Sequence, residues 1–497
     1  MKLAQLLSVY SSFKIGEHPY AEVTGLSLST KNLQKGNLFI ATRGTQSDGH
    51  DFILEACKRE VSGIVVERTE MIPKDFKGAV LTVKNAREAA VRLASRFYDE
   101  PAEKLFCVGV TGTNGKTSTT YMIESVLNHF GLKTGVMGTI NHHLGDKVWG
   151  SELTTPDPIT LFKRLREFVA LEAKAVAFEV SSHALDQNRV QGVPFSAVVF
   201  TNLTRDHLDY HKTMENYFAA KEKLFNELIQ KPAGQDVHAI VNVSDEWGRK
   251  IHVADNAKKI TYGEIQSNYQ FQVLQTHFNG TKFRLHTSKG DYEVQLQVPG
   301  RHNVYNAVAA MAVGVSAGAS MESCIEGIQK FCGVPGRLQK VLSKKNFTVF
   351  IDYAHTDDAL KTVLSILQEI RSQAKIKSRI ITVFGCGGDR DKGKRPLMAQ
   401  AAMNGSDCVW VTSDNPRTED PMRIIEDILA GTPKTSLQDQ VFVEVDRREA
   451  IRKAIAMAEN DDVVLIAGKG HETYQIIGDK KFDFSDYKVA EEYLNGL

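Results

Sequence analysis

A glycine-rich segment, TGTNGKTS at residues 111–118, carries the clearest chemistry in this sequence. It follows an apolar run, LFCVGV, and precedes a helical run, TTYMIESVLNHF, so we expect a strand, a turn and a helix. Such a turn points backbone N–H groups at an anion, and the helix dipole adds to the attraction. Lys116 would reach the β- and γ-phosphates of a nucleotide, and the Thr117 hydroxyl would bind Mg²⁺. The segment therefore predicts a phosphate loop, although Val110 stands where the strict pattern has glycine.

This loop alone does not identify a reaction, because a kinase, a GTPase and an ATP-driven ligase could all use it. An ordinary strand–turn–helix is the purely structural alternative. Further polar clusters directly follow other apolar runs: SSHALDQNR (181–189), TNLTRDH (201–207), GCGGDRDKGKRP (385–396), TSDNPR (412–417) and GKGHETYQ (468–475). In open α/β sheets, ligands bind beyond the carboxyl ends of the strands. We therefore expect these clusters to form the functional site.

The elements that would position these clusters alternate along the chain. Short β-branched runs such as AVAFEV, SAVVF, SRIITVF and DDVVLIAG are separated by amphipathic helical stretches. This rhythm predicts βαβ units and parallel sheets covered on both faces. Two polar joints, YDEPAEK (98–104) and GVPGRLQK (333–340), divide the chain. We predict an α/β protein with domains at residues 1–102, 103–332 and 333–497.

Composition excludes several classes of protein. A length of 497 residues suits about three domains, at roughly 150 residues each. The near-balance of 61 basic and 60 acidic residues argues against binding to nucleic acid or to anionic membranes. The six cysteines show no metal spacing, which favours reduced thiols. The start, MKLAQLLSVYSS, is too weak for a signal peptide, and the longest uncharged stretch is shorter than a membrane span. We expect a cytoplasmic protein without membrane insertion.

The order of the motifs resembles the Mur ligase superfamily, which shares the loop TGTNGKTS with folylpolyglutamate synthetases. The matching segments run in the family's order along nearly the whole chain: EVSSHALDQNRV, NLTRDHLDYH, YFAAKEKLF, GRHNVYNAVAA, GVPGRL, DYAHT, GCGGDRDKGKRPLM, DNPR and GKGHE. The set looks like that of members that add the third residue of the peptidoglycan stem. The resemblance implies a small α/β uridine-binding domain, a central P-loop ATPase domain with a parallel sheet, and a C-terminal Rossmann-like domain. We expect a monomer.

The resemblance also implies ATP-dependent amide formation on UDP-N-acetylmuramoyl-L-alanyl-D-glutamate. The D-Glu side-chain carboxylate attacks the γ-phosphate of ATP, and the incoming amine then attacks the resulting acyl phosphate. Negative charge gathers in one place, so we expect Mg²⁺, in two sites, and protein cations rather than a covalent nucleophile. The residues that correspond to ATP contacts are Gly112, Thr113, Asn114, Gly115, Lys116, Thr117, Ser118, Asn303, Arg337, Asp352 and His355.

The same resemblance implies catalytic roles for Lys116, Glu179, His207 and Lys221. Glu179 and His207 would bind metal together with Thr117, although His207 alone would be taken for a structural or surface histidine. Lys221 corresponds to a lysine that CO₂ carbamylates to N6-carboxylysine, and its structural alternative is a solvated helix cation. Burial beside Ala219 and Ala220 would depress its pKa, and the neutral amine is the form that reacts.

The UDP-linked substrate is expected to contact two groups of residues. In the central domain these are Thr154, Thr155, Ser181, Gln187 and Arg189. In the first domain the chain departs from the family pattern, because Ser29-Thr30-Lys31 stands where Asp-Ser-Arg is usual. Thr30 keeps the hydroxyl, so we predict that it contacts the UDP-linked substrate. We predict the same of Thr45, Gln46 and Ser47 in the following turn, GTQSDGHDF (44–52).

The co-substrate is predicted from the segment DNPR. Its arginine, Arg417, can bind a carboxylate through two parallel hydrogen bonds. In the family that this chain resembles, arginine at this position occurs in members that add meso-2,6-diaminopimelate rather than L-lysine. The full set for diaminopimelate is Arg390, Asp414, Asn415, Pro416, Arg417, Gly468 and Glu472. Lysine would leave Arg417 buried and unpaired, at a cost of roughly 2–5 kcal/mol. The alternatives are a lysine-adding ligase, a folylpolyglutamate-synthetase-like ligase and a catalytically idle nucleotide-binding protein.

Overall fold

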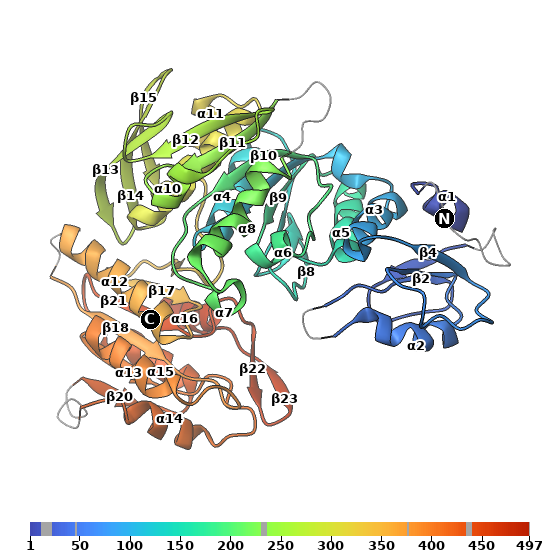
Figure 1. Cartoon of the computed structure of the whole chain (residues 1–497). Coiled ribbons are helices and arrows are strands. Elements are labelled where there is room, and N and C mark those ends of the chain that lie inside the picture. Colours follow the sequence, from blue (N-terminus) through green and yellow to red (C-terminus); the bar gives the residue numbers. More distant parts are fainter. Residues whose placement is uncertain (11–21, 45–46, 230–235, 375–376, 434–439, 497) are drawn as a thin grey trace. The chain divides into compact units, whose positions relative to one another are not determined.

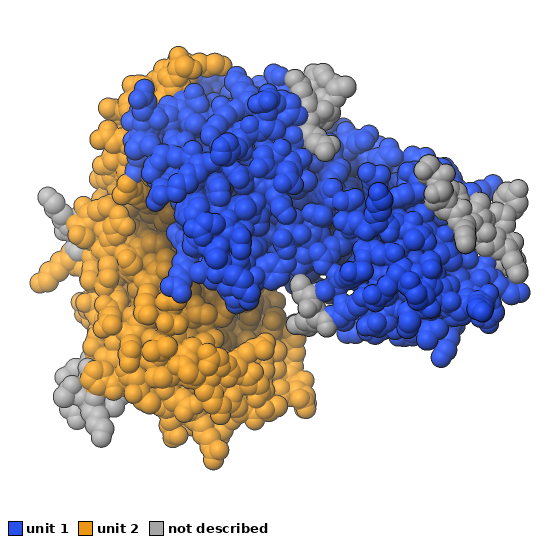
Figure 2. Space-filling view, in the orientation of Figure 1, with its two compact units in different colours: residues 1–270, 306–327 blue, residues 271–305, 328–497 orange. Residues whose placement is uncertain are grey.

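The computed structural model describes residues 1–10, 22–44, 47–229, 236–374, 377–433 and 440–496 (Figure 1). The protein divides into two compact units, drawn in different colours in Figure 2. Unit 1 consists of residues 1–270 and 306–327, and unit 2 of residues 271–305 and 328–497. Parallel sheets with helices on both faces occur in each unit, which confirms the predicted α/β fold. The domain boundaries near 102 and 333 stay predictions.

A small sheet of four parallel strands lies near the N-terminus of unit 1. Across the sheet these are β1 (Gly25–Ser27), β2 (Asn37–Ile40), β3 (Gly63–Val66) and β4 (Ala79–Thr82). Its helices are α1 (Leu3–Leu7), α2 (Ile53–Lys58) and α3 (Ala86–Phe97), with 3₁₀ turns at Gly49–Phe52 and Pro101–Lys104. Because side chains alternate along a strand, Leu38 and Ile40 share the core of α1 and α3, whereas Phe39 packs with Ile53 of α2.

The larger sheet of unit 1 carries the phosphate loop. Its parallel strands, in sheet order, are β12 (Ala257–Gly263), β11 (Val237–Asn242), β10 (Phe195–Phe200), β5 (Phe106–Thr111), β9 (Ala175–Glu179) and β6 (Thr134–Met137). The antiparallel strands β7 (His142–Leu144) and β8 (Lys147–Trp149) continue it. Every residue of β9 and β10 is buried, as expected for strands covered on both faces. Pairing of Phe200 with Thr111 and of Val110 with Glu179 brings the carboxyl ends of β10, β5 and β9 to one edge.

Helices surround this sheet and connect its strands. They are α4 (Lys116–His129), α5 (Pro158–Ala170), α6 (Ser182–Asp186), α7 (Leu208–His211), α8 (Met214–Asn226) and α9 (Glu246–Lys250). Two further helices follow along the chain, α10 (Arg301–Ser316) and α11 (Met321–Gln329). None of the helices in the described ranges is long and apolar enough to cross a membrane.

Unit 2 contains a six-stranded sheet with a Rossmann-like arrangement. In sheet order the strands are β16 (Gln339–Val341), β17 (Thr348–Asp352), β21 (Val463–Ala467), β18 (Ile380–Phe384), β19 (Cys408–Val411) and β20 (Val441–Val443). All pairs are parallel except β16 with β17. One face is covered by α12 (Asp357–Ala374), α13 (Lys394–Gly405) and α14 (Pro421–Leu429), and the other by α15 (Arg447–Met457) and α16 (Asp486–Gly496).

Five further strands belong wholly or mainly to unit 2. The strands β13 (Tyr269–His277), which begins just before unit 2, β14 (Gly280–Thr287) and β15 (Gly290–Leu296) are consecutive neighbours in their sheet. Nearer the C-terminus, β22 (Tyr474–Ile477) and β23 (Lys480–Asp483) form a separate two-stranded hairpin. The sequence did not predict this hairpin, which contacts the DNPR segment.

Candidate active site

The predicted phosphate loop connects the end of β5 at Thr111 to the start of α4 at Lys116. Gly112 and Gly115 have φ values of +148° and +85°, a region that residues with a Cβ rarely adopt. A Cβ on Gly112 would lie 1.9 Å from Thr201 Oγ1, so the close approach of β10 also requires glycine. Thr201 Oγ1 in turn donates to the Asn114 carbonyl at 2.6 Å. Both glycines are therefore needed for the shape of the loop.

Two lysine side chains donate to the same carbonyl of this loop. Lys116 Nζ lies 2.9 Å from the Gly112 oxygen and 2.7 Å from that of Thr113. Lys221, on α8, is fully buried and donates to the Gly112 oxygen at 2.8 Å. Burial, together with the charge of Lys116, holds the pKa of Lys221 well below its usual value. Lys223, two residues further along the same helix, is the alternative lysine for this role, and it is only partly buried. Lys221 is therefore a buried amine beside the phosphate loop rather than a solvated helix cation.

Glu179 ends β9 on the neighbouring strand, and its carboxylate is 1% exposed. Its Oε1 accepts a hydrogen bond from Thr139 N at 2.9 Å, and its Oε2 accepts one from Thr139 Oγ1 at 3.0 Å. A Cβ on Gly138 would approach Oε1 to 2.1 Å, so glycine makes room for this carboxylate. Each carboxylate oxygen retains a further lone pair that could bind a metal ion.

His207 lies in a more open setting. Its backbone is left-handed, with φ of +51°, and its ring is 5.0 Å from that of His183 between centroids. Its Nε2 is 3.5 Å from Asp206 Oδ2. Across the described parts of the chain, no three or more His, Cys, Asp or Glu side chains are grouped so as to hold a metal ion. The expected set draws on a Thr117 hydroxyl and a carbamylated lysine as well, and it stays a prediction.

Four of the residues expected at the UDP-linked substrate come together beyond the end of β9. Thr155 Oγ1 donates to the Glu179 carbonyl at 2.8 Å and accepts from Ser181 N at 3.0 Å. Arg189 Nη1 donates to the Thr155 carbonyl at 2.8 Å. Its Nε and Nη2 both donate to Gln187 Oε1, at 3.1 and 2.6 Å. The fifth, Thr154, lies 3.0 Å from Thr139 between hydroxyl oxygens.

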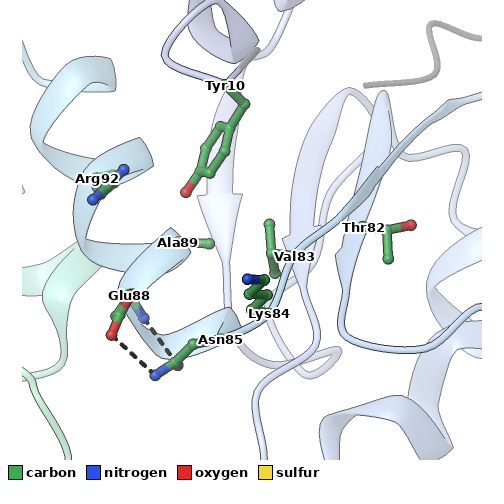
Figure 3. A pocket seen from close by; sticks show the side chains of 8 residues that line it. All are labelled: Tyr10, Thr82, Val83, Lys84, Asn85, Glu88, Ala89 and Arg92. Atoms are coloured by element: carbon green, nitrogen blue, oxygen red, sulfur yellow. Dashed lines mark hydrogen bonds between the residues drawn. The ribbon is translucent and has the colours of Figure 1, made fainter. Parts of the chain in front are cut away.

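The residues of the first domain that are predicted to contact the UDP-linked substrate do not form a recognisable cluster in the described part of the chain. Thr30 is buried and its hydroxyl donates to Glu55 Oε2 at 2.9 Å, so the hydroxyl already has a partner within the fold. The carbonyl of Ser47 accepts from Gly44 N at 2.9 Å, whereas Thr45 and Gln46 lie outside the described residues. A cavity of about 260 Å³ lies beside the start of α3 (Figure 3). It is lined by Tyr10, Thr82, Val83, Lys84, Asn85, Glu88, Ala89 and Arg92, and neither Thr30 nor Ser47 is among them.

Three of the ATP contacts predicted in unit 2 lie together at the end of β17. The buried carboxylate of Asp352 accepts from Leu338 N at 2.7 Å and from Ala354 N at 2.8 Å. Burial raises the pKa of Asp352. The Arg337 guanidinium is 5.6 Å from the centre of the Tyr353 ring, and His355 Nδ1 is 2.8 Å from the Tyr353 carbonyl. Asp352 thus fixes the turn that carries Arg337. Asn303, near the start of α10, donates to the Pro299 carbonyl at 2.8 Å.

Arg417 of the DNPR segment has a left-handed backbone, with φ of +53°. This conformation costs a non-glycine residue of order 1 kcal/mol, so neighbouring structure must hold it. The hairpin β22–β23 does so, since Arg417 N donates to the Ile476 carbonyl at 3.1 Å and Gly478 N donates to the Arg417 carbonyl at 2.7 Å. Its Nη1 donates to the Gly388 carbonyl at 2.7 Å. The expectation of a buried Arg417 with no partner besides the ligand is wrong, because the side chain is half-buried and this carbonyl already binds it.

Arg390 is exposed, and its loop is hydrogen-bonded to the DNPR loop. Gly388 N donates to the Asn415 carbonyl at 2.9 Å. Arg395 is fully buried and binds both carboxylate oxygens of Glu419, at 3.0 and 2.8 Å. These bonds, with one from Asp389 N, lower the pKa of Glu419 to about 2. The loops that carry Arg390 and Arg417 therefore form one scaffold.

The other residues predicted to bind diaminopimelate lie beside this scaffold. Asp414 and Asn415 are buried in the DNPR loop, with Pro416 beside them, and Asn415 Nδ2 donates to Glu472 Oε2 at 3.1 Å. Gly468 has φ of +115°, and a Cβ there would lie 3.2 Å from Asp414 Oδ2. The structure thus brings Asp414, Asn415, Gly468 and Glu472 together.

Sequence reasoning missed three side chains that support the predicted ones: Thr139, Arg395 and Lys469. Thr139 follows β6 closely, so the rule that pointed to the other post-strand clusters could have found it. Arg395 and Lys469 lie inside clusters that were noted. Their roles depend on partners distant in sequence, such as Glu419 for Arg395, which no local pattern reveals.

Comparison with known proteins identifies the family. Three family models match: "Mur ligase family, catalytic domain" at residues 22–98, "Mur ligase middle domain" at 110–314, and "Mur ligase, glutamate ligase domain" at 336–470. Together they account for the three domains expected from the sequence.

Individual relatives agree over the full length. A protein of Aquifex aeolicus named UDP-N-acetylmuramoyl-L-alanyl-D-glutamate--2,6-diaminopimelate ligase is 46% identical over 474 residues, covering 95% of this chain and 94% of its own. A Bacillus cereus protein of that name is 39% identical, covering 100% and 99%. A solved structure of an enzyme of that name is 30% identical, with a TM-score of 0.73 and coverage of 100% and 99%. The chain therefore belongs to the Mur ligase family.

Proposed function

We propose that this protein is the ligase that adds meso-2,6-diaminopimelate to the D-Glu side chain of UDP-N-acetylmuramoyl-L-alanyl-D-glutamate, with conversion of ATP to ADP and phosphate. The observation that carries the choice of amino acid is the scaffold around Arg417. It places a guanidinium in the same loop cluster as the carboxylates of Asp414 and Glu472. A cation and an anion together suit the distal end of diaminopimelate, which carries a carboxylate and an ammonium group. The full-length relatives of that name support the same choice.

ATP binds the loop Gly112–Ser118 in this proposal. Backbone N–H groups and the N-terminus of α4 face the phosphates, and Lys116 supplies the mobile cation. Asn303, Arg337, Asp352 and His355 stay predicted ATP contacts. Mg²⁺, in two sites, neutralises phosphate charge when bound. Its ligands would be the Thr117 hydroxyl, the Glu179 carboxylate and His207, with support from a carbamylated Lys221. Hydroxyl and carboxylate oxygens are the donors that Mg²⁺ prefers.

Carbamylation of Lys221 is supported by the burial and the contacts of its amine. The depressed pKa of Lys221 favours the neutral form, whose nitrogen lone pair attacks CO₂, forms the N–C bond and releases one proton. The product is a carboxylate on a side chain that already reaches the phosphate loop. It places an anion beside the Lys116 ammonium group, where the unmodified side chain has a neutral amine.

The UDP-linked substrate is assigned to Thr154, Thr155, Ser181, Gln187 and Arg189, together with Thr30, Thr45, Gln46 and Ser47 of the first domain. The hydrogen-bonded arrangement of Thr155, Ser181 and Arg189 supports the first group. The proposal places the enzyme in the cytoplasm, as a monomer, without a nucleic-acid partner.

The reaction is tested by incubating the protein with ATP, Mg²⁺, the UDP-linked dipeptide and diaminopimelate. We expect ADP formation that requires both co-substrates, with one UDP-linked tripeptide, identified by mass, for each ADP. A folylpolyglutamate-synthetase-like enzyme would instead release ADP with a folate and glutamate. An idle nucleotide-binding protein would release none. Either result would overturn the proposal.

A further inference from the structure

Lys469 follows β21 in the segment GKGHE, and its side chain is completely buried. Lysine is almost never fully buried unless its charge is paired. The site residues assigned so far include its neighbour Gly468 and the nearby Glu472, but Lys469 itself has no assigned role. Its burial beside them requires an explanation.

The ammonium group of Lys469 has three acceptors, one for each of its hydrogens. Nζ lies 3.1 Å from Asn415 Oδ1, 3.1 Å from Glu472 Oε2 and 3.4 Å from Asp414 Oδ1. All three acceptors belong to residues assigned above to the diaminopimelate site. The side chain therefore connects the DNPR loop to the GKGHE loop.

These contacts fix the orientation of the Asn415 amide. Its Oδ1 accepts from Lys469 Nζ and also from Ile476 N at 2.9 Å. With the oxygen held on that side, Nδ2 is directed to Glu472 Oε2 at 3.1 Å. The same carboxylate oxygen of Glu472 thus receives hydrogen bonds from Lys469 and from Asn415. Loss of Lys469 would remove one of the two hydrogen bonds that each of these oxygens, Asn415 Oδ1 and Glu472 Oε2, accepts.

Lys469 also sets the charge of this cluster of side chains. Asp414 and Glu472 contribute two carboxylates, and Lys469 offsets one of them. Two further buried cations of unit 2 have carboxylate partners of their own: Arg447 binds both oxygens of Asp486 at 2.8 and 2.7 Å, and Arg395 binds Glu419. The group formed by Asp414, Glu472 and Lys469 is therefore left with one net negative charge. That charge matches one ammonium group of a bound amino acid.

We propose that Lys469 is a positioning residue for the acceptor amino acid. It holds the Glu472 carboxylate and the Asn415 amide in place, and it limits the cluster to the charge that one ammonium group balances. This inference rests on the proposed function, because it assumes that the acceptor binds at the cluster of Asp414 and Glu472. The alternative is a purely structural role, in which the buried lysine only stabilises the fold of unit 2.

The test replaces Lys469 by methionine, which has a similar length and no charge, and measures the steady-state constants for each substrate. We expect the KM for diaminopimelate to rise at least tenfold, while the KM values for ATP and the UDP-linked dipeptide stay within about twofold. The variant Lys469→Gln keeps a hydrogen-bond donor but removes the charge, so its KM for diaminopimelate should rise as well.

A matched control is Arg379→Met. Arg379 pairs with the buried carboxylate of Asp462 at 2.6 Å, at the amino end of β18 and therefore away from the acceptor loops. We expect this variant to melt at a lower temperature while all three KM values are retained. A purely structural Lys469 would behave in the same way, with lower stability and an unchanged KM for diaminopimelate.

The outcomes separate this inference from the proposed function. A wild-type protein that does not use diaminopimelate overturns the proposed function. A wild-type protein that does use it, together with a folded Lys469→Met variant of unchanged acceptor KM, overturns the role of Lys469 alone. If Lys469→Met does not fold, Lys469→Gln takes its place, because it keeps a hydrogen-bonding group without the charge. Its KM values for the three substrates then show whether Lys469 positions the acceptor. A folded Lys469→Gln variant with a wild-type KM for diaminopimelate would contradict the charge argument.

Discussion

The variant Lys116→Ala should lose ATP turnover by about 10³-fold or more while it melts within a few degrees of the wild type. Its ammonium group lies in the phosphate loop, where a cation stabilises charge that develops on the transferred phosphoryl group. The side chain is only partly buried and donates to loop carbonyls that water can satisfy after its removal. ADP release and a thermal melt on the same preparation measure both effects.

Lys133→Ala is the matched control for this prediction. Lys133 also donates to a backbone carbonyl, that of Leu171 at 2.8 Å, but it precedes β6 at the amino end of the strand, opposite to the phosphate loop. Its turnover should equal that of the wild type. A folded Lys116→Ala variant with undiminished ligase activity would remove the phosphate-loop assignment.

The variant Lys221→Ala should lose about 10²- to 10³-fold in kcat, and a short carboxylate such as acetate should restore part of the activity. The physical reason is that alanine leaves space beside the Gly112 carbonyl where an added anion can replace the carbamate. The measurement is the rate as a function of acetate concentration, with chloride at equal ionic strength as the reference. A ¹³C NMR carbamate signal under labelled CO₂ should be present in the wild type and absent in the variant.

Lys223→Ala provides the comparison, because Lys223 lies two residues further along α8 and is only partly buried. It should keep both its activity and the carbamate signal. If Lys221→Ala is as active as the wild type, or if no carbamate forms at Lys221, the modification is excluded and Lys221 is a buried lysine of another role.

Much of the fold could be predicted because it depends on local pattern. The run LFCVGV and the glycines after it predict a buried strand and a loop, and β5, Gly112 and Gly115 have these properties. The burial of Lys221 is expected beside Ala219 and Ala220, and Ala220 is buried with it, whereas Ala219 is exposed. Such features follow from the period of apolar residues and from the conformations that glycine allows.

The site could be predicted less completely because several contacts join distant segments. Arg395 meets Glu419, and Lys469 meets Asn415 from more than 50 residues away in sequence. The left-handed backbone of Arg417 depends on the hairpin β22–β23, which follows it by about 60 residues. The Thr30 hydroxyl, predicted to contact uridine, donates to Glu55 within the fold, a contact that the local sequence does not reveal. These contacts depend on tertiary partners, and those partners cannot be identified from a single sequence.

The central claim is that the scaffold around Arg417 selects diaminopimelate, and the ratio of kcat/KM for diaminopimelate and L-lysine tests it most directly. Since Arg417 already has the Gly388 carbonyl as a partner, we expect the lower part of the range given above, about 2 kcal/mol, or a preference of roughly 30-fold. Arg417→Ala should lose most of its activity with diaminopimelate without gaining efficient use of lysine. A wild-type protein with comparable kcat/KM values for the two amino acids would contradict the account.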